Sequence, residues 1–478
     1  MKKYLLLFVF DLLFVFVANS QIQGFDYYVI IDKAKPNHNL GIASLNNEII
    51  IDYQFDLMGT YNDGLCIIKK DDKYRYIDFA GNYLKTPEFD MVYDFYNGFS
   101  LVYLISKNRF SEKVYYGFID TNGTAVIPCT LDYNYIYGFE GEVAAVYKGS
   151  LSKSGQPTIG KYGLINKKGE ETTKCIYDDI DLIPNKPYAM VFIGEIDNKG
   201  VQGKGKVGLI NTKGKIIIPV QFDEIYVGNN NSATAYLLNT ENKKKELQIC
   251  VYNLNGEIVI PLTTQYADIG SISENRIQVS NGSKFGYLDL KSNLIIGFDY
   301  DYGTDFSFNR ATVKKDDNWF IIDTLGNIIN SINADFSICK KFDQNKTALT
   351  FKGKTKNNMP VKGKYGLMNM DGNVIAECIY DTIYSYSEDV ALVRNKKKYG
   401  FIDKTGKEII PIQYDFAFSF SDGLACVKKD FYYGFIDVSN QVVIPFKYYY
   451  AHPFINGIAK VFSEEGKQFI ITNGHILY

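Results

Sequence analysis

Apolar and polar positions alternate with a period of two in short runs along most of the chain, a pattern typical of half-buried β-strands. Residues 398–403 and 408–411 form two such runs, with a turn between them at residues 404–406. A longer connection over residues 416–423 leads to a third run at residues 424–428. The pattern predicts three antiparallel strands, and no stretch has a helical period long enough to predict a helix.

This three-strand pattern recurs along the chain. Residues 398–431 align with residues 432–463 without a gap, so that Pro411 meets Pro445. The glycine of the Tyr-Gly-Phe-Ile-Asp run marks each copy, and we call these positions the repeat-glycine column. They lie 34 to 46 residues apart, at Gly41, Arg75, Gly117, Gly163, Gly208, Cys250, Gly286, Phe320, Gly366, Gly400 and Gly434. A period of this length indicates a repeat architecture, in which each unit buries its apolar face against its neighbours.

The sequence therefore predicts an all-β chain over residues 21–478, a tandem array of about eleven to twelve three-stranded antiparallel units with a partial unit from Phe469. Residues 27–31 match the third strand of a unit, and residues 468–478 supply a first strand, a turn and the start of a second. The two fragments could cap the ends of an open superhelix or complete a propeller-like ring. We expect the open solenoid and keep the closed ring as the alternative.

The units resemble the WG repeat family. Units of that family carry a Lys-Trp-Gly or similar start, an aliphatic-acidic pair, a turn glycine, an Ile-Ile-Pro strand and a later Gly-x-Ala-x-Val strand, and the resemblance covers nearly all of residues 25–478. The chain departs from the family at the tryptophan, because its only tryptophan, Trp319, precedes Phe320, and six units have tyrosine there, at Tyr74, Tyr116, Tyr162, Tyr365, Tyr399 and Tyr433. The resemblance implies a bacterial protein, often exported, that binds or scaffolds rather than catalyses a defined reaction.

The N-terminus has the pattern of a secretory signal peptide. Lys2 and Lys3 form a basic start, residues 4–17 are almost wholly apolar, and small residues precede a possible cut before Gln21. We therefore predict a signal peptide over residues 1–20 and export to the periplasm or the extracellular space. An uncleaved membrane anchor is the alternative, and Asp11 is unusual within the apolar run. No later stretch is long and apolar enough to predict a membrane span.

Composition and charge fit an exported β protein. Aromatic residues make up 15% of the chain, with 39 Tyr and 33 Phe, and such side chains favour half-buried pleated strands. Removal of residues 1–20 would change the formal net charge from −2 to −3, because it takes away Lys2, Lys3 and Asp11. A charge this small does not predict a nucleic acid or an anionic membrane as partner.

Two aspartate columns are the first candidates for chemistry. The first follows the Gly-Phe-Ile run and holds Asp in six units, Asn in four, at Asn166, Asn211, Asn253 and Asn369, and Ser44 in one. An amide cannot act as a general acid or base, so the units with Asn at this position could not catalyse by this mechanism. Asp, Asn and Ser share a short side chain that accepts hydrogen bonds from backbone N–H groups nearby, which fixes a turn. We interpret this column as turn-forming.

The second column lies twelve residues further on and is acidic in nine units, at Asp56, Asp90, Asp132, Asp178, Asp223, Asp301, Asp335, Asp381 and Asp415. Several carboxylates could bind Ca²⁺, but one carboxylate per unit supplies too few ligands unless the units stack closely. A strand-end cap, or an ion pair with a lysine such as Lys206, Lys364 or Lys398, needs only one. We interpret this column as structural.

Cysteine and histidine give little support for a catalytic or metal site. Cys129, Cys175 and Cys378 share an apolar column and are interpreted as core residues, with a Cys129–Cys175 disulfide left open. The three histidines, His38, His452 and His475, are scattered, and no phosphate loop or metal-ligating cysteine spacing occurs. The sequence therefore predicts no catalytic residue, no metal and no cofactor.

Extra residues enter at one equivalent place, the hairpin between the third strand of one unit and the first strand of the next. They lie at residues 105–114, 148–161, 194–206, 239–248 and 352–364. We take eight of their lysines as candidate binding residues, Lys148, Lys161, Lys199, Lys206, Lys243, Lys244, Lys245 and Lys352, and these hairpins also hold Lys153, Lys204, Lys354 and Lys356. Loops on a rigid scaffold are common binding sites, although these loops could equally be solvated and tolerated.

The main hypothesis is a non-enzymatic exported module that binds a protein or glycan of the cell envelope through this loop edge or through exposed tyrosines. The alternative is a polysaccharide-active enzyme in which carboxylates of several units converge on one pocket. A passive spacer is the third possibility.

Overall fold

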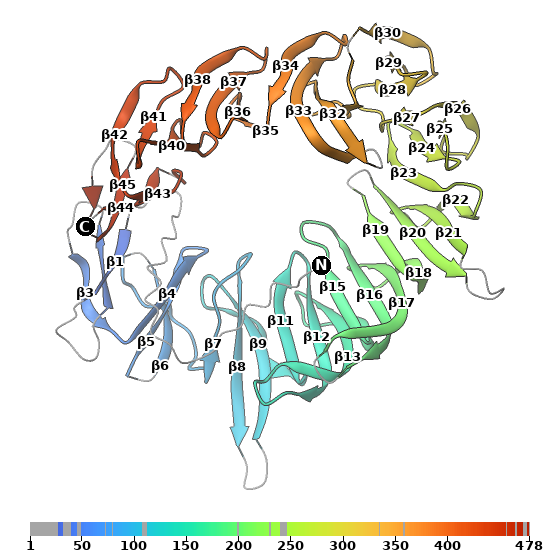
Figure 1. The fold of residues 1–478 in the computed structure, drawn as a ribbon. Coiled ribbons are helices and arrows are strands. Elements are labelled where there is room, and N and C mark those ends of the chain that lie inside the picture. Colours follow the sequence, from blue (N-terminus) through green and yellow to red (C-terminus); the bar gives the residue numbers. More distant parts are fainter. Residues whose placement is uncertain are drawn as a thin grey trace. The chain divides into compact units, whose positions relative to one another are not determined.

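The structure is a computed structural model that describes residues 27–31, 40–44, 49–71, 73–78, 80–107, 112–197, 200–228, 231–239, 246–333, 335–356, 359–455, 457–463, 466–471 and 476–477. The predicted signal peptide at residues 1–20 lies outside the described residues. Every regular element among the described residues is a β-strand (Figure 1). The all-β prediction is confirmed.

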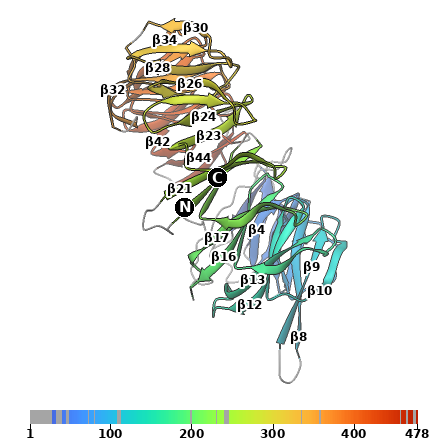
Figure 2. The same cartoon turned by 90° about the vertical axis from the view of Figure 1, so that its right-hand side faces the viewer.

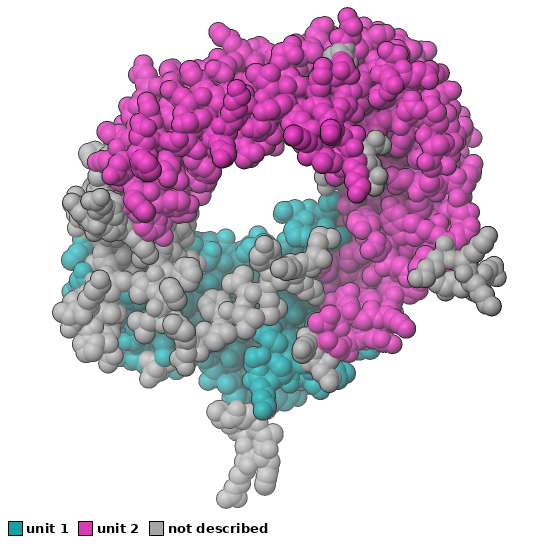
Figure 3. Space-filling view, in the orientation of Figure 1, with its two compact units in different colours: residues 1–177, 182–187, 198–200 teal, residues 178–181, 188–197, 201–478 magenta. Residues whose placement is uncertain are grey.

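Contacts divide the chain into two compact units, which Figure 3 shows in different colours. The first unit comprises residues 1–177, 182–187 and 198–200, and the second comprises residues 178–181, 188–197 and 201–478. The strands of each unit form open antiparallel sheets that succeed one another along the chain (Figure 1).

Four sheets lie within residues 27–177. Their strands, in sheet order, are β1 (Tyr27–Ile31), β2 (Leu40–Ser44) and β3 (Ile49–Phe55); β4 (Leu57–Asn62), β5 (Leu65–Lys70) and β6 (Lys73–Ile77); β7 (Met91–Val92), β8 (Phe99–Lys107), β9 (Glu112–Asp120) and β10 (Ala125–Leu131); and β11 (Tyr135–Glu140), β12 (Val143–Leu151), β13 (Pro157–Asn166) and β14 (Glu171–Tyr177).

Eight further sheets follow, each with four described strands. They are β15 (Asp179–Leu182), β16 (Tyr188–Ile196), β17 (Gln202–Asn211) and β18 (Ile216–Phe222); β19 (Glu224–Val227), β20 (Ser232–Asn239), β21 (Glu246–Asn253) and β22 (Ile258–Thr263); β23 (Asp268–Ser273), β24 (Arg276–Ser280), β25 (Phe285–Leu288) and β26 (Leu294–Tyr300); β27 (Tyr302–Gly303), β28 (Ala311–Lys315), β29 (Asn318–Ile322) and β30 (Ile328–Ile332); β31 (Ile338–Cys339), β32 (Thr347–Lys356), β33 (Met359–Asn369) and β34 (Val374–Tyr380); β35 (Thr382–Ser387), β36 (Val390–Asn395), β37 (Lys398–Asp403) and β38 (Glu408–Tyr414); β39 (Phe416–Ala417), β40 (Ala425–Lys429), β41 (Tyr432–Ile436) and β42 (Val442–Tyr448); and β43 (Tyr450–Ala451), β44 (Ile458–Ser463), β45 (Gly466–Ile471) and β46 (Ile476–Leu477).

The tandem array of about twelve units is confirmed, but ten of the twelve described sheets have four strands where the sequence pattern predicts three. The extra strand has two to six residues and comes from the segment interpreted as a connection. In one sheet it is β39, which pairs with β40 through Phe416 and Lys428. A strand of two residues cannot show a period of two, so the pattern gave no sign of it.

Each sheet combines strands of two successive sequence repeats. In the sheet β39–β42, the first two strands belong to the repeat of Gly400 and the last two to the repeat of Gly434. The N-terminal fragment β1 joins β2 and β3, and the C-terminal strands β45 and β46 complete the sheet that begins at β43. Successive repeats are therefore hydrogen-bonded to each other inside one sheet.

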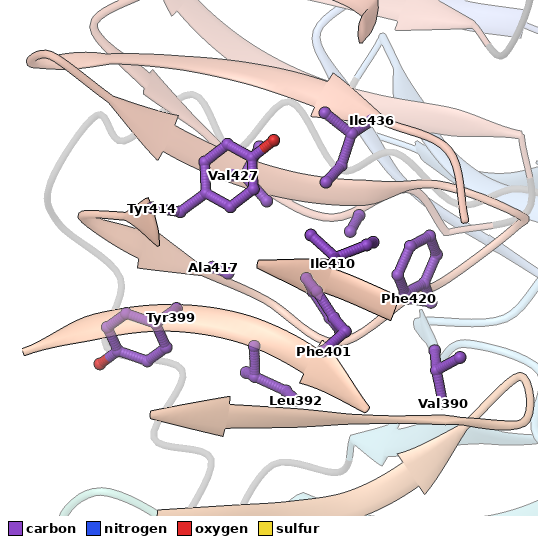
Figure 4. Packing of buried hydrophobic residues seen from close by; sticks show 11 residues of the cluster. Val390, Leu392, Tyr399, Phe401, Ile410, Tyr414, Ala417, Phe420, Val427 and Ile436 are labelled. Atoms are coloured by element: carbon purple, nitrogen blue, oxygen red, sulfur yellow. The ribbon is translucent and has the colours of Figure 1, made fainter. Parts of the chain in front are cut away.

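Apolar side chains fill the space between neighbouring sheets. Phe401 and Ile410 from the sheet β35–β38 are buried in one cluster with Phe420, Val427 and Ile436 from the next part of the chain (Figure 4). Burial of one such side chain contributes about 1.5–3 kcal/mol. The array is thus stabilised by contact between adjacent units, as expected for repeat proteins.

The repeat glycines lie where the last strand of each sheet approaches the backbone of the strand beside it. A Cβ atom at Gly400 would lie 2.6 Å from the carbonyl oxygen of Ile410, and at Gly117 it would lie 2.6 Å from that of Ile127. The last strand has a bulge at this point. Tyr399 pairs with Tyr414 and Phe401 with Ile410, so more residues of the last strand than of its partner lie between the two pairs. A glycine at this point lets the bulged strand approach without a steric clash.

Candidate functional site

The five insertions predicted as loops are mostly strand. They continue the hairpins β8–β9, β12–β13, β16–β17, β20–β21 and β32–β33, which we call the extended hairpins. In β32–β33 the pairing reaches Lys356 and Met359, whereas the ordinary hairpin β40–β41 ends at Lys429 and Tyr432. Figures 1 and 2 show β8–β9 reaching beyond the other strands of its sheet. The candidate binding edge is therefore made of ordered ribbons.

Paired glycines lie under an aromatic ring in three extended hairpins. In β16–β17, Gly194 pairs with Gly205, and a Cβ at Gly205 would lie 2.3 Å from Cζ of Phe192. Tyr147 covers the equivalent pair in β12–β13, and Phe351 covers the pair in β32–β33. Because Tyr147, Phe192 and Phe351 are themselves buried, these rings attach the extended hairpins to the core.

Large apolar side chains are exposed on the extended hairpins. Leu238 and Leu247 pair across β20–β21 and are 38% and 48% exposed, and Met359 and Val361 on β33 are 62% and 66% exposed. Other exposed apolar residues on these hairpins and their turns are Leu104, Leu151, Ile159, Ile193 and Val201. Apolar side chains grouped on a surface commonly mark a binding site.

The candidate lysines do not form one row of unpaired charges. Nζ of Lys206 lies 2.8 Å from Asp223, and Nζ of Lys352 lies 3.3 Å from Asp335. Lys148 lies directly across from Lys161 in β12–β13, and its Nζ is 4.9 Å from the centre of the Tyr133 ring. The remaining candidates lie outside the described residues, at Lys199, Lys243, Lys244 and Lys245.

The densest positive charge that the structure describes on an extended hairpin is in β32–β33. Lys354 and Lys362 are cross-strand neighbours, and Lys356 follows on β32. None of the three has an acidic partner among the described residues. Cross-strand pairs of like charge are unfavourable, so an anionic partner would relieve this repulsion. Sequence reasoning did not include Lys362, because only the register of the hairpin places it opposite Lys354.

The first aspartate column forms turns, as predicted. Oδ1 of Asp403 accepts hydrogen bonds from the N–H groups of Thr405 and Lys407 at 2.8 and 3.0 Å. Oδ1 of Asn166 makes the same two contacts, at 2.9 and 3.1 Å, with the N–H groups of Lys168 and Glu170. Asp and Asn therefore have the same role.

The second aspartate column joins neighbouring strands. Oδ1 of Asp415 lies 2.6 Å from Nζ of Lys398, and Oδ2 accepts the N–H of Asp430 at 3.1 Å. The hydrogen bond from Lys398 holds the pKa of Asp415 below its ordinary value. The same pair of contacts recurs at Asp223, Asp301 and Asp381. The structural interpretation is confirmed for these units.

All seven cysteines have free thiols, so Cys129 and Cys175 form no disulfide in this structure. Burial raises the pKa of the Cys66 thiol to about 12 and also raises the pKa of Cys129 and Cys175. Raised thiol pKa values reduce reactivity. Within the described ranges, no three His, Cys, Asp or Glu side chains are grouped to hold a metal ion. No helix in the described part of the chain could cross a membrane.

Comparison with known families gives a match over most of the repeats. The family described as "WG containing repeat" matches residues 41–74, 74–104, 116–151, 162–195, 208–231, 251–285, 285–319, 365–399, 399–430 and 433–467. A comparison with curated proteins finds no match.

Solved structures with detectable similarity are distant. A eukaryotic initiation factor is 11% identical over 73% of this chain and 95% of its own, with a TM-score of 0.31. Hsv2p of Kluyveromyces lactis is 11% identical over 52% of this chain and 93% of its own, with a TM-score of 0.26. BamB of Moraxella catarrhalis is 10% identical over 67% of this chain and 92% of its own, with a TM-score of 0.20. Similarity this low carries no argument about function.

Proposed function

The chain belongs to the WG containing repeat family, and from this premise we propose that it is an exported, non-enzymatic module that binds a protein or glycan of the cell envelope through its extended hairpins. Repeat arrays offer long surfaces on which equivalent loops project from equivalent places.

The observation that carries the proposal is the exposed apolar surface of the extended hairpins. Leu238 and Leu247 are exposed although they face each other on neighbouring strands, and burial of each against a partner would contribute roughly 1–2 kcal/mol at about 25 cal/mol per Å². The lysines of β32–β33 add positive charge beside Met359 and Val361.

Rigidity of the extended hairpins also supports a binding role. The buried rings of Phe192 and Phe351 cover the glycine pairs at the base of two hairpins, so these ribbons lose little conformational freedom on contact with a partner. A preformed surface binds at lower entropic cost than a flexible loop.

A polysaccharide-active enzyme on the same scaffold has weaker support. General acid–base chemistry needs carboxylates free to exchange protons with a substrate. Several members of both aspartate columns, such as Asp403 and Asp415, are instead engaged by backbone N–H groups and lysine.

The experiment is capture of envelope proteins and glycans by the intact protein and by two sets of variants. In the first set, each extended hairpin is shortened to the two-residue turn of β40–β41, Asp430-Phe431. The second set keeps the hairpins and replaces exposed apolar residues, in Leu238→Ser with Leu247→Ser and in Met359→Ser with Val361→Ser. We expect the intact protein to retain a partner that the shortened protein loses and that at least one serine pair weakens tenfold or more.

The matched control is Ile258→Ser, which changes a side chain 56% exposed on β22, outside the extended hairpins. It should leave capture unchanged. All variants must keep the circular dichroism spectrum of the intact protein. Equal capture by intact and shortened proteins would contradict the proposed surface.

A further inference from the structure

The repeat that starts near Arg75 has charged residues at two positions where the other repeats have none. Arg75 occupies the repeat-glycine column. In most repeats, the residue ten positions after this glycine places its carbonyl oxygen against the glycine. At that position, this repeat has Lys85. Most equivalents of Lys85 are buried isoleucines, at Ile51, Ile127, Ile218, Ile260, Ile296, Ile410 and Ile444. Both departures introduce a positive charge.

The last strand seen in other sheets is missing from this one. The sheet β4–β6 has three strands, and β6 meets the following segment only at a bridge between Ile77 and Tyr83 and at the N–H of Leu84, 2.9 Å from the carbonyl oxygen of Tyr76. Arg75 stands where most other repeats have the glycine against which the bulged last strand packs. Lys85 cannot enter the core position, because an unpaired buried ammonium group is strongly unfavourable.

The other two exceptions in the repeat-glycine column keep their last strand. Sγ of Cys250 donates to the carbonyl oxygen of Ile260 at 3.2 Å, and β21 still pairs with β22. Phe320 pairs directly with Ser331, in a ladder without a bulge at that point. A bulkier residue than glycine therefore does not by itself remove the strand. This repeat differs further in having Lys85 and also Pro87, which has no N–H group to donate to a neighbouring strand.

A pocket lies where the strand is missing. Its volume is about 650 Å³, and its lining includes Lys73, Tyr74 and Arg75 of β6, Tyr83 and Lys85 of the following segment, and Leu104 of β8. This volume lies in the range of small-molecule binding sites. We call it the Arg75 pocket.

The wall of the pocket is fixed at several points. Leu84 and Phe89 contact the buried cluster of the first unit that contains Tyr76. The N–H of Asp90 donates to the carbonyl oxygen of Tyr103 at 3.1 Å, and Oδ2 of Asp90 accepts the N–H of Ile105 at 2.6 Å. Because both ends of the segment are held, the space in front of residues 85–88 is a preformed feature of the fold.

The charges of the Arg75 pocket are arranged differently from those of other repeats. By the spacing of Lys398 and Asp415, Lys73 should pair with Asp90, but its Nζ lies 2.9 Å from Oε1 of Glu88 instead. Cζ of Arg75 lies 5.8 Å from the centre of the Tyr83 ring. Neither Arg75 nor Lys85 forms a close ion pair with a described residue, although Arg75 helps Lys73 to lower the pKa of Glu88.

Three basic and two acidic side chains line the pocket, Lys73, Arg75, Lys85, Glu88 and Asp90, which leaves a formal charge of one positive. A ligand with a single carboxylate would neutralise this charge. Arginine binds a carboxylate through two parallel hydrogen bonds, and such charge-assisted bonds are stronger than neutral ones.

We propose that the Arg75 pocket binds an acidic sugar, such as a uronic acid residue of a glycan. Arg75 and Lys85 bind the carboxylate, the rings of Tyr74 and Tyr83 offer flat apolar faces to the C–H face of the sugar, and Glu88 and Asp90 accept hydrogen bonds from its hydroxyl groups. An acidic peptide would supply the carboxylate but fewer hydroxyl donors for Glu88 and Asp90. Of the residues that line the pocket, Leu104 also belongs to the surface proposed above, but the ligand class of the pocket does not depend on that proposal.

Isothermal titration of the purified protein with a galacturonate trisaccharide tests the assignment. We expect saturable binding that Arg75→Gln and Lys85→Gln each weaken at least tenfold, and no binding of the neutral galactose trisaccharide. Lys174→Gln, which changes an exposed lysine on β14 outside the extended hairpins, is the matched charge control and should bind like the unchanged protein. The protein with shortened hairpins should also bind, so a failure of the hairpin proposal would leave this result intact.

Thermal unfolding of each variant shows whether it is folded, and Tyr83→Ala provides a second test that changes no charge and should weaken binding severalfold. Absence of binding by the folded, unchanged protein would overturn the assignment. So would equal affinity in the Arg75→Gln and Lys85→Gln variants. Triglutamate bound as tightly as the trisaccharide would assign the pocket to an acidic peptide, and inorganic phosphate bound as tightly would reduce it to a general anion site.

Discussion

Nζ of Lys398 lies 2.6 Å from Oδ1 of Asp415, and the second oxygen of this carboxylate accepts the N–H of Asp430. One aspartate thus joins the turn of the hairpin β40–β41 to the start of β37. We expect Asp415→Ala to destabilise this sheet by about 1–2 kcal/mol, because a hydrogen bond to a charged acceptor is lost. Asp415→Asn should cost less, since an amide oxygen still accepts the N–H. Hydrogen exchange at the Asp430 amide measures both effects, and equal protection in Asp415→Ala and the unchanged protein would contradict this role.

Acid should destabilise the array through the same column. Hydrogen bonds from Lys284, Lys364 and Lys398 lower the pKa of Asp301, Asp381 and Asp415 in the folded protein. The unfolded chain, with carboxyl pKa values near 4, binds protons first as the pH falls. The stabilisation is therefore complete above about pH 5 and is lost as the pH falls through the lower folded pKa values.

Urea unfolding between pH 2.5 and 7 measures this effect. The urea midpoint should be nearly constant from pH 5 to 7 and should fall below about pH 4. A variant with Asp301→Asn, Asp381→Asn and Asp415→Asn should show a shallower fall. The same acid dependence in both proteins would mean that other carboxylates dominate.

Gly400→Ala should destabilise the chain by about 1–3 kcal/mol, the usual cost of overpacking. Its Cβ would lie 2.6 Å from the carbonyl oxygen of Ile410, so β38 must move. Gly138→Ala is the control, because no atom lies within 4 Å of its Cβ. Urea midpoints compare the two variants, and a similar small effect in both would refute the explanation given for the repeat-glycine column.

Arg75→Gly combined with Lys85→Ile should supply the strand that the sheet β4–β6 lacks. The substitutions restore the most common residue types at these two positions, and we expect the amides of residues 85, 86, 88 and 89 to exchange at least tenfold more slowly. Arg75→Gly alone should have little effect, because Lys85 still cannot be buried. Unchanged exchange in the double variant would show that other residues keep the strand away.

The sequence predicted the features that recur in every unit. The turns at Asp403 and Asn166 follow from short polar side chains next to a turn, which is a local property. The repeat period identified the array because equivalent glycines, such as Gly400 and Gly434, meet the same steric demand. Local and repeated constraints of this kind are visible without a structure.

Features that depend on contacts between distant residues were not predictable in the same way. The short strand Phe416–Ala417 has no pattern of its own and forms only because β40 lies beside it. The lysines expected to form a basic edge, such as Lys206, are in part neutralised by aspartates on other strands. Arg75 was visible as an exception among glycines, but its link to Lys85 depends on the pairing of two strands.

The division of each sheet between two successive repeats has a consequence for how such a chain can change in length. Removal of residues 400–433 would join Tyr399 directly to Gly434, so that β36 would meet β41 through a hairpin of the same form as before. Every remaining strand would still find a partner of the expected sequence. Unequal recombination can therefore add or remove whole copies and leave each strand paired within its sheet as before.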